Sequence, residues 1–397
     1  MRLSRRELVA FIALGLVSLF ADMTYEGARS VLGAYLDVLG AGAVVAGSVA
    51  VGDFLGYVAR GAGGMLAHRL RSSKAYWALV FFGYAVNLFA VPALAFAGSW
   101  GVALALILIE RIGKGLRTPA RDAILAEVTE GIGKGKGFGL HEVMDQVGAV
   151  AGPALVGYAL LASGGTYSEA FKMLFIPALI ALLMLSVAFI NYPSLKGVSG
   201  VREGRERRAS LGRSFWLYTL AMSLLALGFM HWSLIAFHLK ASGVMKGYEI
   251  AYMYVVAMLA DAAVAFPAGY LYDRFGPKTL IATPFLAIAA PAVLLRCGLN
   301  GISAVPVAAV IWGVLMGLYE TNMRVTVADT VRPELRAYAY GMYGMMFGIS
   351  WAAGNALMGA LYPVSLHALL AFIVLVEVAS LAALVTFLNE FNAATTK

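Results

Sequence analysis

The sequence has little cysteine and little charge. Cys297 is its single cysteine, so the chain has no intrachain disulfide and no cysteine cluster that could bind a metal. Only 13% of the 397 residues are charged, compared with roughly 25% in ordinary soluble domains. The low charge places the chain outside the composition of soluble globular proteins.

Sequence patterns of ATP hydrolysis and of common hydrolases are also missing. The segment GIGKGKG at 131–137 is rich in glycine and lysine but lacks the GxxxxGK[ST] spacing of a phosphate-binding loop. The sequence contains no nucleophile elbow, no HExxH and no carboxylate pair framed for hydrolysis. We therefore expect neither an ATP-driven pump nor an enzyme, and no cofactor other than a driving ion.

Hydrophobic residues dominate instead, at 61% of the chain with a mean hydropathy of +0.81. A helix that crosses a bilayer needs about 20 mostly apolar residues. The sequence offers twelve such segments, at 8–34, 42–66, 75–97, 100–121, 138–162, 170–191, 214–238, 248–270, 279–298, 303–326, 338–361 and 366–388. The first is long and internally charged, so we expect it to be retained rather than cleaved as a signal peptide. The fold class predicted is an all-α membrane protein with twelve transmembrane helices.

The basic residues are distributed unevenly between the two sets of loops. Nineteen lysines and arginines lie at the termini or in alternate loops, and only four lie in the other set. This positive-inside bias predicts that both termini are cytoplasmic in a multi-pass protein of the plasma membrane. The net charge of +8 therefore reflects topology, and we expect no nucleic-acid partner.

A weak internal repeat divides the chain. A shift of 202 residues aligns Glu127 with Asp329 and Gly152 with Gly354, and a shift of 205 aligns GMLAHR at 64–69 with GYLYDR at 269–274. Two similar offsets indicate a duplicated six-helix unit. We predict pseudo-symmetric bundles at 1–192 and 214–397, joined by a basic cytoplasmic linker at 193–213 that is attracted to anionic membrane lipid.

Several short motifs resemble those of the major facilitator superfamily. GYLYDRFGPK at 269–278 is similar to its loop motif, although the copy at 64–74 has His68 in place of the acid. RIGKG at 111–115 is similar to its helix-4 motif, with Lys114 where glutamine is usual. GAVAGPALVG at 148–157 resembles the helix-5 motif of its antiporters. The resemblance implies a gating role for Gly269, Asp273, Arg274, Gly276 and Lys278, and a helix-packing role for Gly148, Gly152, Pro153 and Gly157.

The residues of these motifs also have simpler physical interpretations. Asp273 and Arg274 could pair with helix ends in one conformation and release them in another, or they could form a tight turn that fixes the topology. The glycines let helices approach closely and Pro153 leaves a carbonyl without its helical partner, which packing alone would explain.

Charged residues lie on one face of several predicted helices. Glu110, Lys114, Arg117 and Arg121 follow one another at spacings of 4, 3 and 4, and about 1.5 Å of rise per residue places Glu110 near the middle of the bilayer. Charges at this depth are costly, at about 2.5–3.5 kcal/mol each, so they must face water or ionic partners. One alternative is a set of buried ion pairs. Another is that Arg60, Arg117, Arg121 and Asp122 extend to the cytoplasmic interface.

The hypothesis that follows is a secondary active transporter. A channel or passive pore is disfavoured because the charges are mixed in sign rather than arranged in rings of one sign. We predict alternating access with proton-coupled export of an amphiphilic or cationic compound by a monomer, around a cavity between the two halves. Transport of an organic anion on Lys114 and Arg117, or of a metal ion, is the alternative. The predicted coupling and substrate residues are Asp22, Glu26, Arg29, Asp53, Glu110, Arg111, Lys114, Arg117, Glu142, Asp145, His231, Glu320 and Arg324.

Overall fold

The computed structural model describes residues 4–70, 72–129, 134–195, 211–295, 303–332 and 336–395. Every regular element in these ranges is helical, and a helix lies over each of the twelve predicted segments. Most of the linker, at 196–210, lies outside the described residues, so the predicted boundary between duplicated halves stays a prediction.

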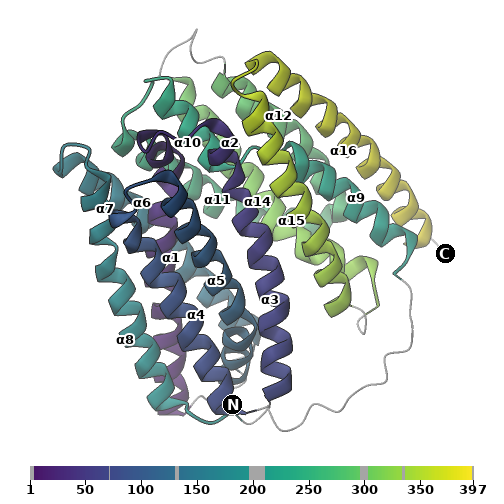
Figure 1. Ribbon diagram of the computed structural model, residues 1–397. Helices are drawn as coiled ribbons and strands as arrows, with labels where there is room; N and C mark the ends of the chain where they lie inside the picture. Colours follow the sequence, from purple (N-terminus) through teal and green to yellow (C-terminus); the bar gives the residue numbers. More distant parts are fainter. Residues whose placement is uncertain are drawn as a thin grey trace. The chain divides into compact units, whose positions relative to one another are not determined.

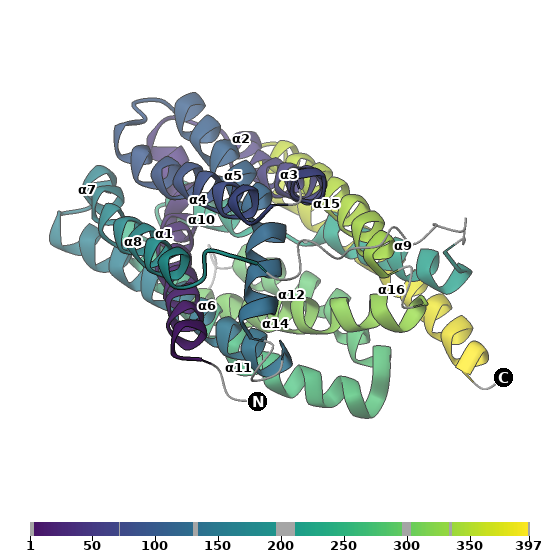
Figure 2. The same ribbon diagram turned by 90° about the horizontal axis from the view of Figure 1, so that it is seen from below.

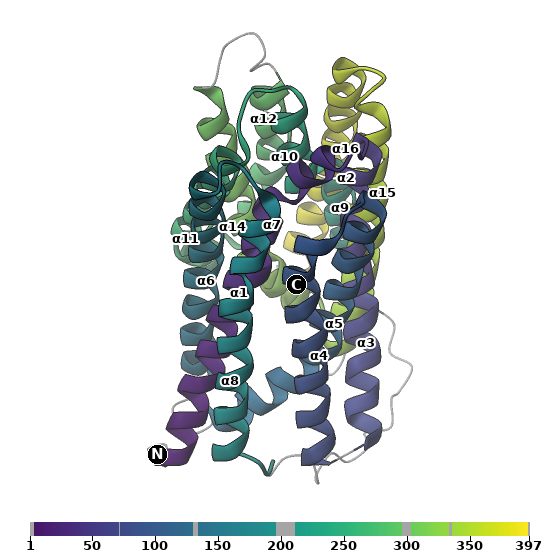
Figure 3. The ribbon, with the colours of Figure 1, turned by 60° about the vertical axis from the view of Figure 1, so that its left-hand side comes forward.

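The helices of the first half of the chain are α1 (Arg5–Val38), α2 (Ala43–Ser48), α3 (Ala50–Leu70), α4 (Ser73–Ala93), η1 (Leu94–Phe96), α5 (Trp100–Val128), α6 (Lys134–Ala162), α7 (Tyr167–Met173) and α8 (Phe175–Asn191). Of these, α1, α5 and α6 extend beyond the predicted segments, and the other helices cover theirs in shorter pieces. Two predicted segments are interrupted, at Val49 and at Leu174. Figure 3 shows the second interruption, where the short α7 leads into the long α8.

The helices of the second half follow the same plan. They are α9 (Arg213–Gly228), α10 (Trp232–Ala241), α11 (Gly247–Phe275), η3 (Gly276–Ile281), α12 (Ala282–Leu295), α14 (Ala304–Thr330), α15 (Arg336–Leu361) and α16 (Leu366–Thr395). Nine helical stretches of the described chain are long and apolar enough to cross a membrane, and one of them, Gly247–Leu295, covers two predicted segments in succession. The all-helical membrane fold is therefore confirmed.

The described residues fall into two compact units that do not follow chain order. The first unit is drawn from Met1–Tyr35, Leu55–Arg205 and Lys246–Tyr252. The second is drawn from Leu36–Phe54, Glu206–Met245 and Met253–Lys397. Asp53 and α2 thus belong to the second unit, although they precede most of the first unit in sequence.

Small residues set the helix contacts in the first unit. Helices α4 and α5 lie side by side (Figure 1), and a Cβ atom on Gly83 would stand 2.5 Å from the Arg117 Cβ. A Cβ atom on Gly113 would stand 2.8 Å from the Asn87 backbone nitrogen. Only glycine allows this approach, which brings the charged face of α5 against α4.

The glycines aligned by the repeat make equivalent contacts in the two units. A Cβ atom on Gly152 of α6 would stand 2.2 Å from the Met23 carbonyl oxygen of α1. A Cβ atom on Gly354 of α15 would stand 2.0 Å from the Leu227 carbonyl oxygen of α9. Figure 2 shows α15 and α16 beside α9 in the second unit. The packing interpretation of the glycine motif therefore applies to both units.

A break in the predicted segment 214–238 shapes the second unit. Helix α9 ends at Gly228 and α10 begins at Trp232, so three residues leave the helical hydrogen-bond pattern. Asn355 of α15 replaces the missing bonds: its Oδ1 accepts from the His231 N–H at 2.7 Å and its Nδ2 donates to the Phe229 carbonyl at 3.2 Å. The Trp312 indole donates to the Met230 carbonyl at 3.0 Å. The break is thus held by side chains of two other helices.

Candidate functional site

The first unit gathers Asp22 of α1, Lys114 of α5 and Asp145 of α6 into one charged cluster. Tyr25 lies one helical turn after Asp22 and donates its hydroxyl hydrogen to the Asp22 carboxylate. The Lys114 ammonium lies 3.6 Å from the centroid of the Tyr25 ring. Asp22 interacts electrostatically with Asp145 and Lys114, but it forms no salt bridge with any residue that the structure describes. Its carboxylate therefore keeps acceptor positions for a proton or a cation.

Arg117 forms a cation–π contact with the ring of Tyr84 in the same unit. Its guanidinium carbon lies 3.7 Å from the centroid of the Tyr84 ring, and the residue is only 1% exposed. Within the described chain, its Nε and Nη1 atoms have no hydrogen-bond acceptor. The alternative that Arg117 extends to the interface is wrong, because the side chain is enclosed between α4 and α5. A cation–π contact of this kind stabilises the charge by about 2 kcal/mol when water is excluded.

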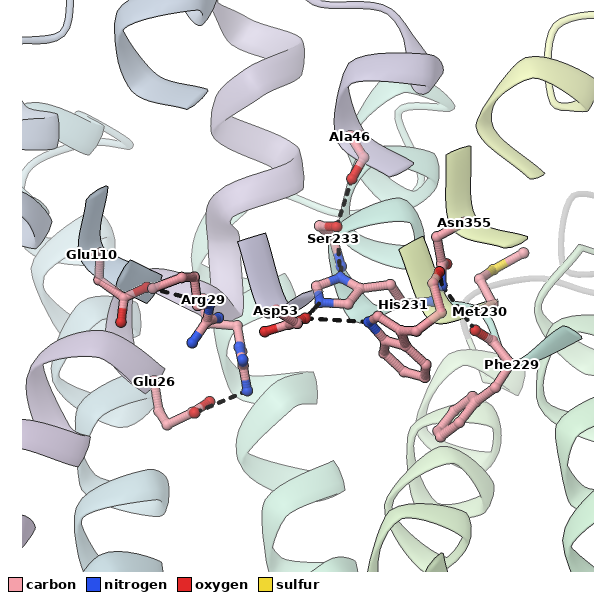
Figure 4. Close-up of polar contacts among 12 residues, drawn as sticks. Glu26, Arg29, Ala46, Asp53, Glu110, Phe229, Met230, His231, Ser233 and Asn355 are labelled. Carbon is pink, nitrogen blue, oxygen red and sulfur yellow. Dashed lines mark hydrogen bonds and ion pairs between the residues drawn. The ribbon is translucent and has the colours of Figure 1, made fainter. Parts of the chain in front are cut away.

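A cluster of polar side chains centred on Glu110 lies nearer the start of α5 than Lys114 and Arg117. The Asn87 Nδ2 donates to the Glu110 Oε1 at 2.6 Å, and the Arg111 Nε lies 3.3 Å from the Glu110 Oε2. Asn87, Glu110 and Arg111 are each at most 5% exposed. The Glu26–Arg29 ion pair of α1, with a 3.0 Å separation, belongs to the same unit (Figure 4).

A small pocket of about 20 Å³, room for about one water molecule, lies beside these charges in the first unit. Arg29, Glu110 and Arg111 supply its charges and Tyr25 supplies a ring. The other lining residues are apolar: Ala28, Leu32, Ala90, Val91, Leu94, Leu106 and Ile107. The pocket combines an apolar wall with a few converging polar groups, but in this conformation it is too small for an organic substrate.

Arg121, the last residue of the charged face of α5, forms hydrogen bonds with other polar residues. Arg121 donates from Nη2 to the Asp122 Oδ1 at 2.7 Å and from Nη1 to the Ser18 hydroxyl at 3.4 Å. The His141 Nε2 lies 2.8 Å from that hydroxyl and 3.9 Å from the Asp145 Oδ1. Arg121 is therefore an anchored residue, whereas Lys114 and Arg117 rest on rings.

A second acid–base pair lies in the second unit. The Nε2 of His231 is 3.3 Å from the Asp53 Oδ2, and the Trp351 indole donates to the same oxygen at 3.2 Å. The Ser233 N–H donates to the His231 Nδ1 at 3.0 Å, which places the proton of the neutral ring on Nε2, toward Asp53 (Figure 4). Two of the predicted coupling residues, Asp53 and His231, thus lie together in the second unit.

The hydrogen bonds of His231 fix the neutral ring in one tautomer. The Ser233 hydroxyl lies 2.7 Å from the His231 Nδ1 and donates to the Ala46 carbonyl at 2.7 Å. Because Nδ1 already accepts from the Ser233 N–H, a second proton there would displace that bond, whereas the Nε2–H is directed at the Asp53 carboxylate.

The structure does not gather the remaining predicted residues into these sites. Glu142 and Glu320 are exposed on α6 and α14, and the side chain of Arg324 lies outside the described residues. Asp273, Arg274 and Lys278 are exposed around the end of α11, where Gly276 has a φ of 63° that favours glycine. Among the described residues, no three His, Cys, Asp or Glu side chains converge on a position that could hold a metal ion.

Sequence reasoning missed the residues that orient the charges. Tyr25 and Tyr84 read as ordinary aromatic residues of apolar helices. Asn87 and Asn355 are single amides within apolar runs, which is a detectable signal because a buried amide needs partners. The partners themselves come from distant parts of the chain, so no local pattern names them.

Comparisons with known proteins agree with the helical membrane architecture. The sequence profile of the Major Facilitator Superfamily matches residues 12–255 and 235–396. An uncharacterised protein of Mycobacterium tuberculosis is 37% identical over 373 residues, which are 92% of this chain and 90% of that protein. An uncharacterised MFS-type transporter of Methanocaldococcus jannaschii is 24% identical over 359 residues, covering 89% of this chain and 88% of the relative.

Solved transporter structures have the same fold at low sequence identity. The nucleoside transporter NupG superimposes with a TM-score of 0.71 at 15% identity and covers 96% of this chain and 99% of its own. The peptide transporter POT in complex with sulfate gives a TM-score of 0.76 at 14% identity, with 96% and 93% covered. The chain belongs to the major facilitator superfamily, and it is a multi-pass membrane transporter rather than an enzyme.

Proposed function

We propose that this transporter exchanges protons for an organic cation, or for an amphiphilic compound with a cationic group, and that Asp22 is the shared binding residue. The observation that carries the proposal is the state of the Asp22 carboxylate. It receives a hydrogen bond from Tyr25 and forms no salt bridge with a described residue, although Lys114 rests on the neighbouring ring. A part-buried carboxylate without a fixed counter-ion attracts either a proton or a cationic ligand.

Competition for one carboxylate supplies the coupling. A proton on Asp22 removes the negative charge that would attract a cation, and a bound cation disfavours the proton, so the two ligands exclude each other. Exclusive binding at a site that is exposed alternately to the two sides of the membrane produces exchange. Export is the direction that the helix-5 motif suggests, and Gly148 of that motif packs α6 against α1 at Leu19 and Asp22.

We assign the Asp53–His231 pair to proton movement in the second unit. The Nε2–H of His231 faces the Asp53 carboxylate at 3.3 Å, so a proton can be shared between these two side chains. His231→Gln keeps a polar side chain but cannot take up that proton. We expect this variant to bind substrate with unchanged affinity and to lose coupling to the proton gradient.

The test is transport in proteoliposomes with an imposed pH gradient. A panel of lipophilic cations, with tetraphenylphosphonium as the first probe, is added while the lumenal pH is followed. The best binder is selected beforehand by thermal shift, because a ligand that binds the folded state raises its apparent stability. Movement of protons on addition of the cation, abolished in Asp22→Asn, is the expected result. Glu169→Gln is the matched control, since Glu169 pairs with Lys172 on an exposed helix end.

Cation transport that ignores the gradient would remove the exchange mechanism and leave the transporter assignment intact. Asp22→Asn that transports and couples as the wild type does would remove Asp22 from the mechanism. The assay distinguishes both outcomes because it measures substrate movement as well as lumenal pH.

One observation favours a second candidate, transport of an organic anion. The Nε and Nη1 atoms of the buried Arg117 have no acceptor within the described chain, and Lys114 forms no salt bridge there. Such donors could hold a carboxylate or phosphate. Replacing Lys114 and Arg117 with Gln, with exposed Lys172→Gln as the control, separates the candidates: loss of anion binding favours the anion, and retained cation binding favours exchange at Asp22.

A further inference from the structure

Glu377 is a buried acid that the sites described above do not use. It lies in the middle of α16 within the apolar run IVLVEVASL, and it is 0% exposed. Neither of its carboxylate oxygens has a hydrogen-bond partner in the part of the chain that the structure describes. At about 1.5 Å per residue, it is roughly 16 Å from the start of α16 at Leu366, a depth near the middle of a bilayer.

The Glu377 side chain is directed at the end of α9. A Cβ atom on Gly228 would stand 2.5 Å from the Glu377 Oε1 and 3.1 Å from its Cδ. Gly228 is the last residue of α9, immediately before the break that Asn355 holds. The carboxyl thus lies at a helix C-terminus, where the peptide dipoles present partial negative charge and repel a carboxylate.

Among the described residues of the neighbouring elements, no opposite charge compensates an ionised Glu377. Helix α12, which packs on α16, has no charged residue. Arg213 of α9 pairs with Glu390, which is 13 residues, or roughly 20 Å, further along α16. Lys278 of η3 and Arg336 of α15 lie at helix ends, His367 is roughly 15 Å away along α16, and Tyr218 and Tyr343 stack beside Phe387. His231, three residues after Gly228, faces Asp53.

We propose that Glu377 is a proton-binding site of the second unit, which carries its proton in the conformation described here and releases it when the break between α9 and α10 rearranges. An ionised carboxyl without a partner in this position would be far more costly than a neutral one. A neutral amide or an apolar residue would fill the site at lower cost, so packing gives no reason for a carboxyl. Release of the proton does give one.

The proton is tested chemically with dicyclohexylcarbodiimide, an apolar reagent that reacts with protonated carboxyl groups. The O–H adds across one C=N bond: the proton goes to nitrogen and the oxygen to carbon, and the adduct rearranges to a stable N-acylurea without a leaving group. Peptide mapping of purified protein in detergent near neutral pH is expected to find label on Glu377. Glu390 of the same helix, with a side chain 38% exposed, is the internal control. We expect it to carry at most roughly one tenth of the label found on Glu377. Glu377→Gln removes the label.

Infrared difference spectroscopy keeps the proposal falsifiable if the reagent fails to reach the site. The wild-type spectrum minus that of Glu377→Gln is expected to contain the carbonyl band of a protonated carboxylic acid near neutral pH, and the band is expected to disappear in alkaline buffer while the protein stays folded. Absence of the band near neutral pH would overturn the protonated state. A band that persists at every pH at which the protein is folded, together with wild-type transport by Glu377→Gln, would overturn the release of the proton.

Discussion

Asn355→Ala tests how much one side chain contributes to the break between α9 and α10. The residue is 0% exposed and forms hydrogen bonds to the His231 N–H at 2.7 Å and to the Phe229 carbonyl at 3.2 Å. Its third bond, to the Trp351 carbonyl at 3.0 Å, is made within its own helix. Truncation to Ala removes the bonds that Asn355 makes to the His231 N–H and to the Phe229 carbonyl in a buried region.

The expected loss follows from these two groups. A buried polar group without a partner costs about 1–3 kcal/mol, so two of them predict a decrease of about 2–6 kcal/mol in the free energy of unfolding. Asn191→Ala is the matched control, because the Asn191 Nδ2 bonds only the Val187 carbonyl of its own helix, at 2.9 Å. We expect this control to change the free energy by less than about 0.5 kcal/mol.

The assay is unfolding in mixed micelles with increasing sodium dodecyl sulfate, followed by tryptophan fluorescence. Trp312 and Trp351 lie beside the break, so their emission reports on it directly. Equal losses for Asn355→Ala and Asn191→Ala would refute the reasoning that Asn355 replaces the missing helical bonds.

Three further predictions concern helix packing and the contacts of charged side chains. Gly354→Ala places a Cβ atom 2.0 Å from the Leu227 carbonyl oxygen, and we expect it to lower the free energy of unfolding by at least about 1–3 kcal/mol in the same assay. Gly341→Ala, whose Cβ atom would have nothing within 4 Å, should leave the free energy unchanged, and similar results for both variants would contradict the close-packing argument. Tyr84→Phe keeps the ring under Arg117 and should be neutral, but Tyr84→Leu should lose about 2 kcal/mol, and equal stability of the two variants would remove the cation–π contact from the account. Gly228→Ala should cost about 1–3 kcal/mol in the wild type and less in a Glu377→Ala background, since its Cβ meets the Glu377 carboxyl; additive losses in this double-mutant cycle would mean that the two residues are uncoupled.

The helices and the charged face of α5 could be predicted from the sequence because both depend on short-range periodicity. Apolar runs of bilayer length give the helices, and the spacing of Glu110, Lys114 and Arg117 gives their common face. The repeat that aligns Gly152 with Gly354 corresponds to similar packing, since Gly152 meets a carbonyl of α1 and Gly354 meets a carbonyl of α9.

The partners of the charged residues could not be predicted because they depend on long-range contacts. Asp53 and His231 are both predicted site residues, but no local pattern pairs them, since they are 178 residues apart in sequence. The break at Phe229–His231 has no proline to mark it and depends on Asn355, more than a hundred residues later. Glu377 was detectable as a lone acid in an apolar run, but its position against Gly228 was not.

The most direct test of exchange at Asp22 is the number of protons released when a cation binds. Titration calorimetry in detergent, repeated in buffers with different ionisation enthalpies, measures this number for the strongest cation found by thermal shift. The account predicts a release that approaches about one proton per bound cation at a pH where Asp22 is protonated in the free protein, and none in Asp22→Asn. Cation binding with no proton released at any pH would contradict it.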